Sequence, residues 1–197
     1  MSQSAKTVTC CIMSYNYGHL VSQAIESVLC QTRKFDKVKV YDDGVFDFYK
    51  VPSIYPEAQF IQRSQNMGIV ANFNDALNNV DTDLVMFLGA DNWLHPETLE
   101  KLLTLDEDII SYPAYLVGVG KYKRWEPGVP HGSSLYNVEK AKAVGGYEAS
   151  GNEHTEEDSV LFKKMRQAGA SCALYDKPML YYRWNHRTNY NKHSEDL

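Results

Sequence analysis

The sequence predicts an α/β fold with a mostly parallel sheet flanked by helices, and two observations carry this prediction. The first hundred residues alternate apolar, β-rich runs with segments whose apolar residues recur at helical spacing. The unbroken apolar run at 84–88 is typical of a central strand that is covered on both faces. Polar residues follow several of these runs. Because the carboxyl ends of parallel strands meet at one edge, where ligands of open α/β sheets bind, we expect a functional site there.

The elements of the first half follow from apolar periodicity and turn residues. They are, in order, a strand over 7–13, a helix over 19–29, strands over 35–41 and 59–62, a helix from 69 to about 79, the central strand, and a helix that begins at Pro96 with Glu97 and Glu100 in its opening turn. The first, second and fourth strands each deliver polar residues to one edge of the sheet.

The second half is expected to form a smaller, mixed region. Residues 109–119 are apolar and β-like, whereas 122–134 are rich in glycine, proline and aromatic residues. A short helix over 138–144 ends at Gly145-Gly146, and a longer one over 156–168 ends at Gly169. Two β runs over 171–175 and 179–184 precede a polar tail. Without a repeat or a linker, the sequence predicts one domain over 1–197.

Composition and cysteine spacing exclude several classes of protein. The 197 residues are 44% hydrophobic and 23% charged, and the net charge of −5 argues against a non-specific nucleic-acid binder. The four cysteines form no C-x-x-C pair, so we expect buried, reduced thiols at Cys10, Cys11, Cys30 and Cys172. No apolar run reaches the length of a membrane span, which predicts a soluble, cytoplasmic protein without an integral membrane segment.

Asp91 is the first candidate site residue, because it comes directly after the central strand. The small residues Gly89 and Ala90 let a ligand approach the backbone, and a carboxylate oxygen suits Mg²⁺ or Mn²⁺. The alternative is ordinary turn chemistry, in which an Asp after a strand has no ligand.

Two further strand ends offer groups that suit a nucleotide base. Turn chemistry explains one Asp before Gly44, but Asp42 and Asp43 repel each other, so the second acid needs another reason. A carboxylate there can accept a hydrogen bond from a base N–H, such as uracil N3. Ser14-Tyr15-Asn16 follows the first strand at the same edge, either as a simple strand-to-helix turn or as the opposite side of a base site.

An acidic run at 155–158 opens the long helix of the second half. Acids there complement the helix N-terminus by about 0.3–1 kcal/mol each, but three acids exceed what capping needs, so one of them can face a pocket. A carboxylate at a helix N-terminus is expected to stay ionised, which suits a general base for an alcohol. His186 is either a surface residue of the tail or closes a pocket over an anionic ligand. The loop over 125–131 is a candidate acceptor-side loop.

Taken together, these residues resemble the family 2 glycosyltransferases, which have the GT-A fold, over about residues 7–188. The matching segments are the strand that ends in Ser14-Tyr15-Asn16, the first-helix signature at 24–32, Asp42-Asp43-Gly44, Asn66-Met67-Gly68 with Asn74, the segment 88–94 in the place of the DXD motif, Gly145-Gly146-Tyr147, Glu157-Asp158 with Arg166 and Gly169, and Tyr182-Arg183 with His186.

The resemblance implies a role for each of these residues. The nucleotide-sugar site would comprise Ser14, Tyr15, Asn16, Asp42 on the base, Asn66, Gly68, Asn72 and Ala90. The metal site for Mn²⁺ or Mg²⁺ would comprise Asp91 and His186, and the catalytic pair would be Asp158 as the base with Glu157 beside it. The implied reaction is inverting transfer of a sugar from a nucleoside diphosphate, most often UDP, to an acceptor hydroxyl. Residues 1–105 would bind the nucleotide sugar, and 106–188 the acceptor, with a tail over 189–197.

Three departures from the family pattern weaken the expected grip on the diphosphate. Gly89 replaces the first Asp of the DXD motif, Asn92 replaces a following acid, and Phe73 replaces an Arg of the second helix. They leave a second reading, a catalytically inactive nucleotide- or sugar-binding module, although Asp158 and His186 favour an active enzyme. The sequence does not identify the donor sugar, and a polysaccharide, a lipid-linked sugar, a protein and modified DNA all remain open as acceptors.

Overall fold

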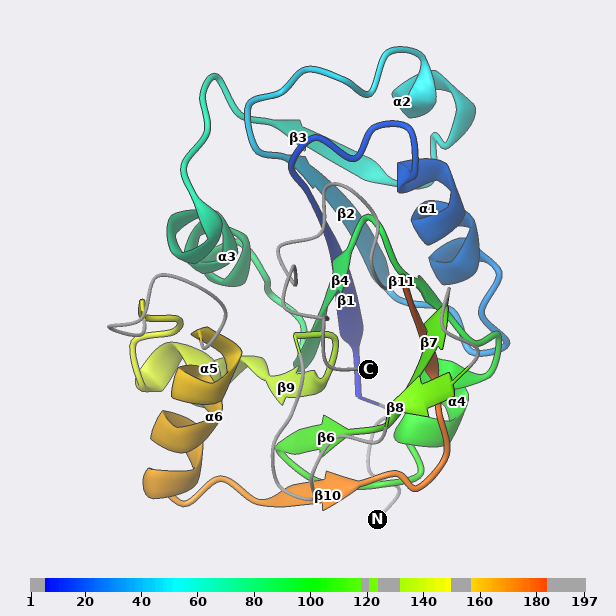
Figure 1. The fold of residues 1–197 in the computed structure, drawn as a ribbon. Coiled ribbons are helices and arrows are strands. Elements are labelled where there is room, and N and C mark those ends of the chain that lie inside the picture. The colour runs from blue at the N-terminus through cyan, green and yellow to red at the C-terminus, as the bar shows by residue number, and fades with distance from the viewer. Residues whose placement is uncertain (1–5, 118–120, 124–131, 150–156, 184–197) are drawn as a thin grey trace.

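The computed structural model describes residues 6–117, 121–123, 132–149 and 157–183, and it has an α/β architecture. A seven-stranded, mostly parallel sheet forms the centre, and a four-stranded sheet lies beside it (Figure 1). This confirms the predicted fold class. The elements of the large sheet and its helices account for most of the first half of the chain.

The large sheet has the strand order β10-β6-β9-β4-β1-β2-β3. Pairs β1–β2, β1–β4, β2–β3 and β6–β10 are parallel, whereas β9 runs antiparallel to both β4 and β6. The strands are β1 (Val8–Ser14), β2 (Lys37–Asp42), β3 (Gln59–Gln62), β4 (Leu84–Gly89), β6 (Ile109–Ser111), β9 (Leu135–Asn137) and β10 (Cys172–Leu174).

Helices cover both faces of the large sheet, as Figure 1 shows. All seven residues of β1 are buried, and alternate side chains join two separate cores, with Cys10 in one and Cys11 in the other. The first core is closed by α1 (Val21–Leu29) and α4 (Thr98–Leu102), and the second by α3 (Ile69–Asn78), α5 (Val138–Ala143) and α6 (Glu157–Gln167). The predicted central strand, β4, is buried in the same two-sided way.

The small sheet has the order β5-β11-β7-β8 and carries a row of stacked aromatic rings. The rings of Trp93, Tyr181 and Tyr115 come from three neighbouring strands, with centroids 5.4 Å apart at each step. The strands are β5 (Trp93–Leu94), β7 (Ala114–Val117), β8 (Lys121–Lys123) and β11 (Leu180–Arg183). The short helix α2 (Val51–Ile54) lies on the loop between β2 and β3.

Several sequence predictions need correction. The helix expected to begin at Pro96 begins at Thr98, because the N–H and hydroxyl of Thr98 both bind His95 O in a preceding turn. The β run over 109–119 is two strands in different sheets, because Pro113 has no N–H to continue a ladder. Cys30 is exposed and Cys172 is only half-buried, whereas Cys10 and Cys11 are buried as expected. Strands β5, β8 and β9 and helix α2 were not predicted.

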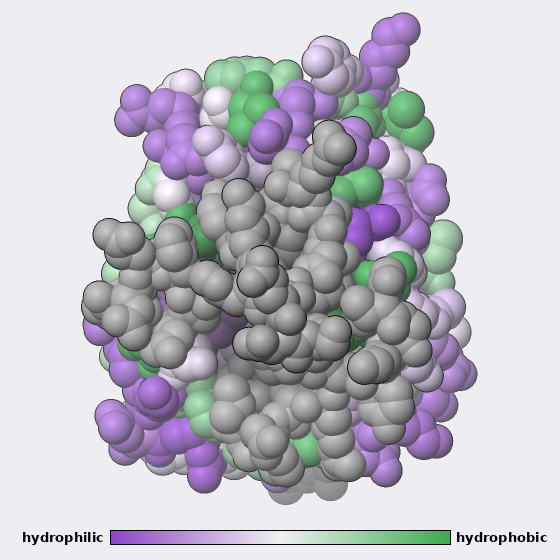
Figure 2. Space-filling model, viewed as in Figure 1, coloured by the Kyte–Doolittle hydropathy of each residue, from purple (hydrophilic) through white to green (hydrophobic). Residues whose placement is uncertain are grey.

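The described surface is mixed in polarity, and its helices are short. Figure 2 shows hydrophilic side chains interspersed with hydrophobic ones over the described residues of one face. None of the helices in the described ranges is long and apolar enough to cross a bilayer.

The polar strand ends predicted for one edge of the sheet do lie together there. Ser14 pairs with Asp42 across β1 and β2, and Met13 pairs with Gly89 across β1 and β4. The pairing continues one step beyond the strands, since Ala90 N donates to Met13 O at 2.9 Å. We call this edge, at the carboxyl ends of β1, β2 and β4, the rim.

A side-chain amide ties the second half of the chain to α3. Asn74 Nδ2 donates to Tyr147 O at 2.8 Å, and Tyr147 N donates to Asn74 Oδ1 at 2.8 Å. Gly146 has φ +69°, and a Cβ there would come within 2.3 Å of Asn74 Oδ1. The side chain of Asn74 therefore satisfies both the backbone N–H and the backbone C=O of Tyr147, as a neighbouring strand would.

We expect Asn74→Ala to lower the free energy of unfolding by about 2–3 kcal/mol, because each backbone group left without a partner costs roughly 1–3 kcal/mol when it is shielded from water. Urea unfolding followed by circular dichroism measures the change. Asn78→Ala is the matched control, since Asn78 is exposed on the same helix and its replacement gains the same helix propensity. Equal midpoints for the two variants would contradict the role given to Asn74.

Candidate active site

The carboxylate of Asp42 holds the loop that follows β2. Its Oδ1 accepts from Val45 N at 3.0 Å, and its Oδ2 accepts from Phe46 N at 2.8 Å and from Gln62 Nε2 at 3.2 Å. Asp42 is fully buried. It thus has a structural task in addition to the predicted contact with a base, and that contact stays a prediction.

The contacts of Asp43 explain why a second acid follows Asp42. Its Oδ1 accepts from Met67 N at 2.9 Å and its Oδ2 from Gly68 N at 3.2 Å, so it joins the rim to the loop before α3. Gly68 has φ +78°, and a Cβ at Gly44 would come within 2.4 Å of Asn66 N. The loop that carries the predicted residues Asn66 and Gly68 is therefore packed directly against the end of β2.

The residues after β1 form the opposite side of this part of the rim. The Oγ of Ser14 is buried and has no hydrogen-bond partner within the described ranges. Tyr15 is exposed, and Asn16 has φ +64°, which places both in a sharp turn after the strand. Gly18 N donates to Asp47 Oδ2 at 2.7 Å, which fixes this turn against the loop after β2.

The carboxylate of Asp91 is held over the end of β4. Asn92 Nδ2 donates to Asp91 Oδ1 at 2.9 Å, and Ala90 is buried beside β1. A Cβ at Gly89 would come within 2.7 Å of Asp91 Oδ1, so the carboxylate occupies the space over the glycine. Asp91 is nearly buried at the rim, next to the strand that carries Ser14.

The rim supplies some of the ligands that a divalent ion needs, but not a full set. Asp91 offers hard carboxylate oxygens, and Mg²⁺ is commonly bound by one or two carboxylates together with substrate phosphates. Within the described ranges no group of three or more His, Cys, Asp or Glu side chains could hold an ion. His186, the predicted second ligand, lies outside the described residues. The site therefore fits only an ion that takes its remaining ligands from a bound substrate and from water.

Asp158, in the first turn of α6, is a half-buried residue whose Oδ1 is fully shielded from solvent. That oxygen has no hydrogen-bond partner in the part of the chain that the structure describes. A Cβ at Gly132 would come within 2.9 Å of Asp158 Oδ2. Because β9 runs antiparallel to β4, residues 132–134 lead toward the carboxyl end of β4, so Asp158 faces the same rim.

The electrostatic environment of Asp158 corrects one expectation. Burial first, and the neighbouring charge of Glu157 second, raise the pKa of Asp158 to about 7. The carboxylate is therefore harder to ionise than expected at a helix N-terminus, because burial and repulsion by Glu157 both oppose its charged form. Two buried tyrosines, Tyr136 and Tyr147, lie within electrostatic reach of the carboxylate, and burial raises the pKa of both.

The position where the family pattern expects an Arg is filled by an aromatic group. The ring of Phe73 stacks on Phe87 at 5.1 Å and meets the edge of Tyr147 at 5.2 Å. The predicted residue Asn72 is buried beside it, and its Oδ1 accepts from Arg63 Nε at 3.4 Å. Arg63 also pairs with Asp75 and lies over the ring of Tyr41 at 5.0 Å.

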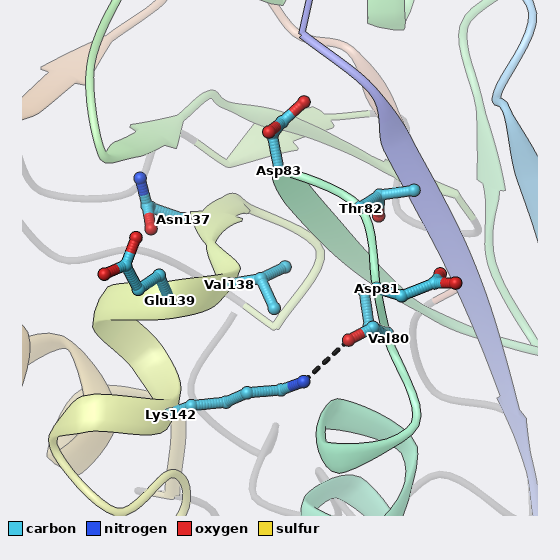
Figure 3. A pocket seen from close by; sticks show the side chains of 8 residues that line it. All are labelled: Val80, Asp81, Thr82, Asp83, Asn137, Val138, Glu139 and Lys142. Carbon is cyan, nitrogen blue, oxygen red and sulfur yellow. Dashed lines mark hydrogen bonds between the residues drawn. The ribbon is translucent and has the colours of Figure 1, made fainter.

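A separate pocket of about 410 Å³ lies at the opposite edge of the large sheet. Figure 3 shows the residues around it, where Lys142 Nζ donates to Val80 O at 2.6 Å. Its lining residues 80–83 precede β4, so the pocket belongs to the amino ends of the strands and is not part of the rim.

The structure thus brings together most of the residues that the sequence singled out. Ser14, Asp42, Ala90 and Asp91 lie at the rim, and Asp43 joins it to the loop that carries Asn66 and Gly68. Asp158 lies beside Gly132. The predicted loop over 125–131 lies outside the described residues. The contacts of Gln62 and Gly132 were missed. Gln62 could have been noticed as a polar residue ending a strand, but Gly132 carries no local signal because its partner is 26 positions away in the chain.

Solved structures with the same fold belong to TarS of S. aureus. Residues 1–349 of TarS in complex with UDP-GlcNAc superimpose with a TM-score of 0.77 at 16% identity, covering 91% of this chain and 59% of that one. The same segment in complex with UDP gives a TM-score of 0.75 over 90% of this chain and 60% of that chain. At this identity the likeness establishes the GT-A fold alone.

A similar sequence is the glycosyltransferase GlyA of Streptococcus pneumoniae serotype 4 (strain ATCC BAA-334 / TIGR4). It is 28% identical over 119 residues, which are 58% of this chain and 16% of GlyA. The chain therefore spans only a minor part of the length of this relative. The model of Glycosyl transferase family 2 matches residues 9–183. The chain belongs to glycosyl transferase family 2.

Proposed function

We propose that this family 2 glycosyltransferase transfers a sugar from a UDP-sugar to an acceptor hydroxyl with inversion at the anomeric carbon. The observation that carries the proposal is the placement of Asp158, a shielded carboxylate that faces the same rim as Asp91. The TarS structures with UDP-GlcNAc and UDP have this fold, which supports UDP as the nucleotide.

Asp158 is the general base in this proposal. Its carboxylate takes the proton of the acceptor hydroxyl as the hydroxyl oxygen attacks the anomeric carbon, and the bond to the diphosphate breaks on the opposite side. The products are the glycosylated acceptor and UDP, and the proton remains on Asp158. A pKa of about 7 suits this task, because a base is most effective when its pKa lies near the working pH.

The nucleoside would bind along the rim between the turn after β1 and the loops held by Asp42 and Asp43. The buried Oγ of Ser14, which has no partner among the described residues, offers a hydrogen bond to this ligand, and the exposed ring of Tyr15 offers apolar surface to a base. Asp91, with His186, would hold Mn²⁺ or Mg²⁺, which would neutralise charge on the leaving diphosphate. The acceptor would approach from the side of the rim on which Asp158 lies.

Replacing the base without changing its shape tests its role. We expect Asp158→Asn to lower the rate of UDP release from UDP-sugars on the order of 10²–10⁴-fold, because the amide cannot take a proton. UDP affinity measured by calorimetry should stay unchanged. Asp81→Asn makes the same substitution at the opposite edge of the sheet and should leave the rate as it is. A rate that survives in Asp158→Asn would remove Asp158 from the mechanism.

The pH dependence follows from the raised pKa of Asp158. The base must be ionised, so we expect kcat/KM to fall as the pH drops through about 7. Glu157 raises this pKa by repulsion, so Glu157→Gln should lower it and move the acidic limb to lower pH. Rates of UDP release between pH 5 and 9 measure both profiles. A limb that moves to higher pH in Glu157→Gln would contradict the assignment.

Calorimetric titration with UDP tests the donor site and its metal. We expect UDP to bind more tightly with Mn²⁺ than with EDTA, and Asp91→Ala to abolish the difference between the two. A panel of other nucleoside diphosphates provides the comparison. If no nucleotide binds, the donor site is wrongly placed; if UDP binds equally well in both conditions, Asp91 holds no ion.

A further inference from the structure

Asn92, which stands where the family pattern has an acid, uses both ends of its side-chain amide. Its Nδ2 donates to Asp91 Oδ1 at 2.9 Å, and its Oδ1 accepts from Arg183 N at 2.9 Å. One partner is a carboxylate and the other a backbone N–H, so only one orientation of the amide satisfies both. The residue is nearly buried, with 6% of its surface exposed, and its bond to Asp91 is shielded from water.

A carboxylate at this position could make only one of the two bonds. It would still accept from Arg183 N, but it has no proton to donate to Asp91. It would also bring a second negative charge close to Asp91 Oδ1, and like charges at this distance repel strongly when they are partly shielded. The contacts of Asn92 thus require an amide.

Gly89 provides the space that this arrangement needs. A Cβ there would come within 2.7 Å of Asp91 Oδ1 and 3.0 Å of Asn92 Nδ2, so the Asp91 carboxylate would have to move and the Asn92 amide would be crowded. The two departures from the DXD pattern are therefore coupled. The glycine makes room for the Asp91 carboxylate, and the amide holds that carboxylate in place.

Arg183 extends the arrangement to the small sheet. Its Nε donates to Asp91 O at 3.1 Å, and its guanidinium lies over the ring of Trp93 at 5.0 Å. One of its terminal nitrogens donates to Gln23 Oε1 at 2.7 Å. The turn over 89–92 is thereby joined to the end of β11 and to α1.

We infer that Asn92 is a positioning residue that aims the Asp91 carboxylate at a divalent ion, and that the site works with one carboxylate and an amide in place of a pair of acids. The inference rests on the proposed role of Asp91. It assigns Asn92 a task in metal affinity without making it a ligand. Gly89 is part of the same arrangement, because any larger residue displaces the carboxylate that Asn92 holds.

Calorimetry of UDP binding with Mn²⁺ and with EDTA tests this inference on the whole chain. Asn92→Asp should weaken the binding of UDP with Mn²⁺ by roughly 10–100-fold, the usual effect of removing a partner that orients a ligand. Its affinity for UDP in EDTA should not change. Gly89→Ala, checked for folding by circular dichroism, should act in the same direction. Asn78→Asp adds the same charge on an exposed helix end and should change neither affinity.

The outcomes separate this inference from the proposed function. If UDP with Mn²⁺ binds more tightly to Asn92→Asp, the position is that of a ligand and the inference is overturned. Unchanged Mn²⁺ dependence in both Asn92→Asp and Gly89→Ala overturns it as well. If the wild-type protein binds UDP equally well with Mn²⁺ and with EDTA, Asp91 holds no ion. The proposed metal site is then wrong, and the inference about Asn92 fails with it.

Discussion

The parallel pairing of β1 with both β2 and β4 is the constraint on which the rest of the structure depends. It aligns Ser14 with Asp42 and Met13 with Gly89, so three loops that are far apart in the sequence leave the sheet at the same level. Since all seven residues of β1 are buried between two helical layers, the strand cannot shift without exposing one of the two cores. The register of one strand thus determines where the donor groups of the site can lie.

The carboxylates at this edge differ in the hydrogen-bond donors that surround them, and this difference indicates different roles. Asp42 and Asp43 accept hydrogen bonds from loop backbone groups and thereby hold the loops. Asp91 accepts from the side-chain amide of Asn92. Asp158 Oδ1 has no such partner within the described residues, and its pKa is correspondingly raised. A carboxylate that lacks compensation is the one best prepared to take up a proton.

Local patterns in the sequence were sufficient for much of the fold. The strand over Gln59–Gln62 and the helix that begins at Ile69 match their predicted bounds, because apolar spacing and turn residues mark both ends. The same patterns could not reveal that Tyr112-Pro113 divides one apolar run between two sheets, since sheet membership is decided by distant partners. Asn92 was read as a lost acid, because its contact with Arg183 joins residues 91 positions apart.

The aromatic trio of Phe73, Phe87 and Tyr147 has a consequence for how this chain can diverge from its relatives. Three rings from α3, β4 and the segment after α5 pack against one another, so each depends on the size and polarity of the other two. An Arg at position 73 would bring a charged group among these rings, while Asn74 still pins Tyr147 in place. An Arg at this position would therefore require changes in the neighbouring rings as well, so the three aromatic residues constrain one another's substitution.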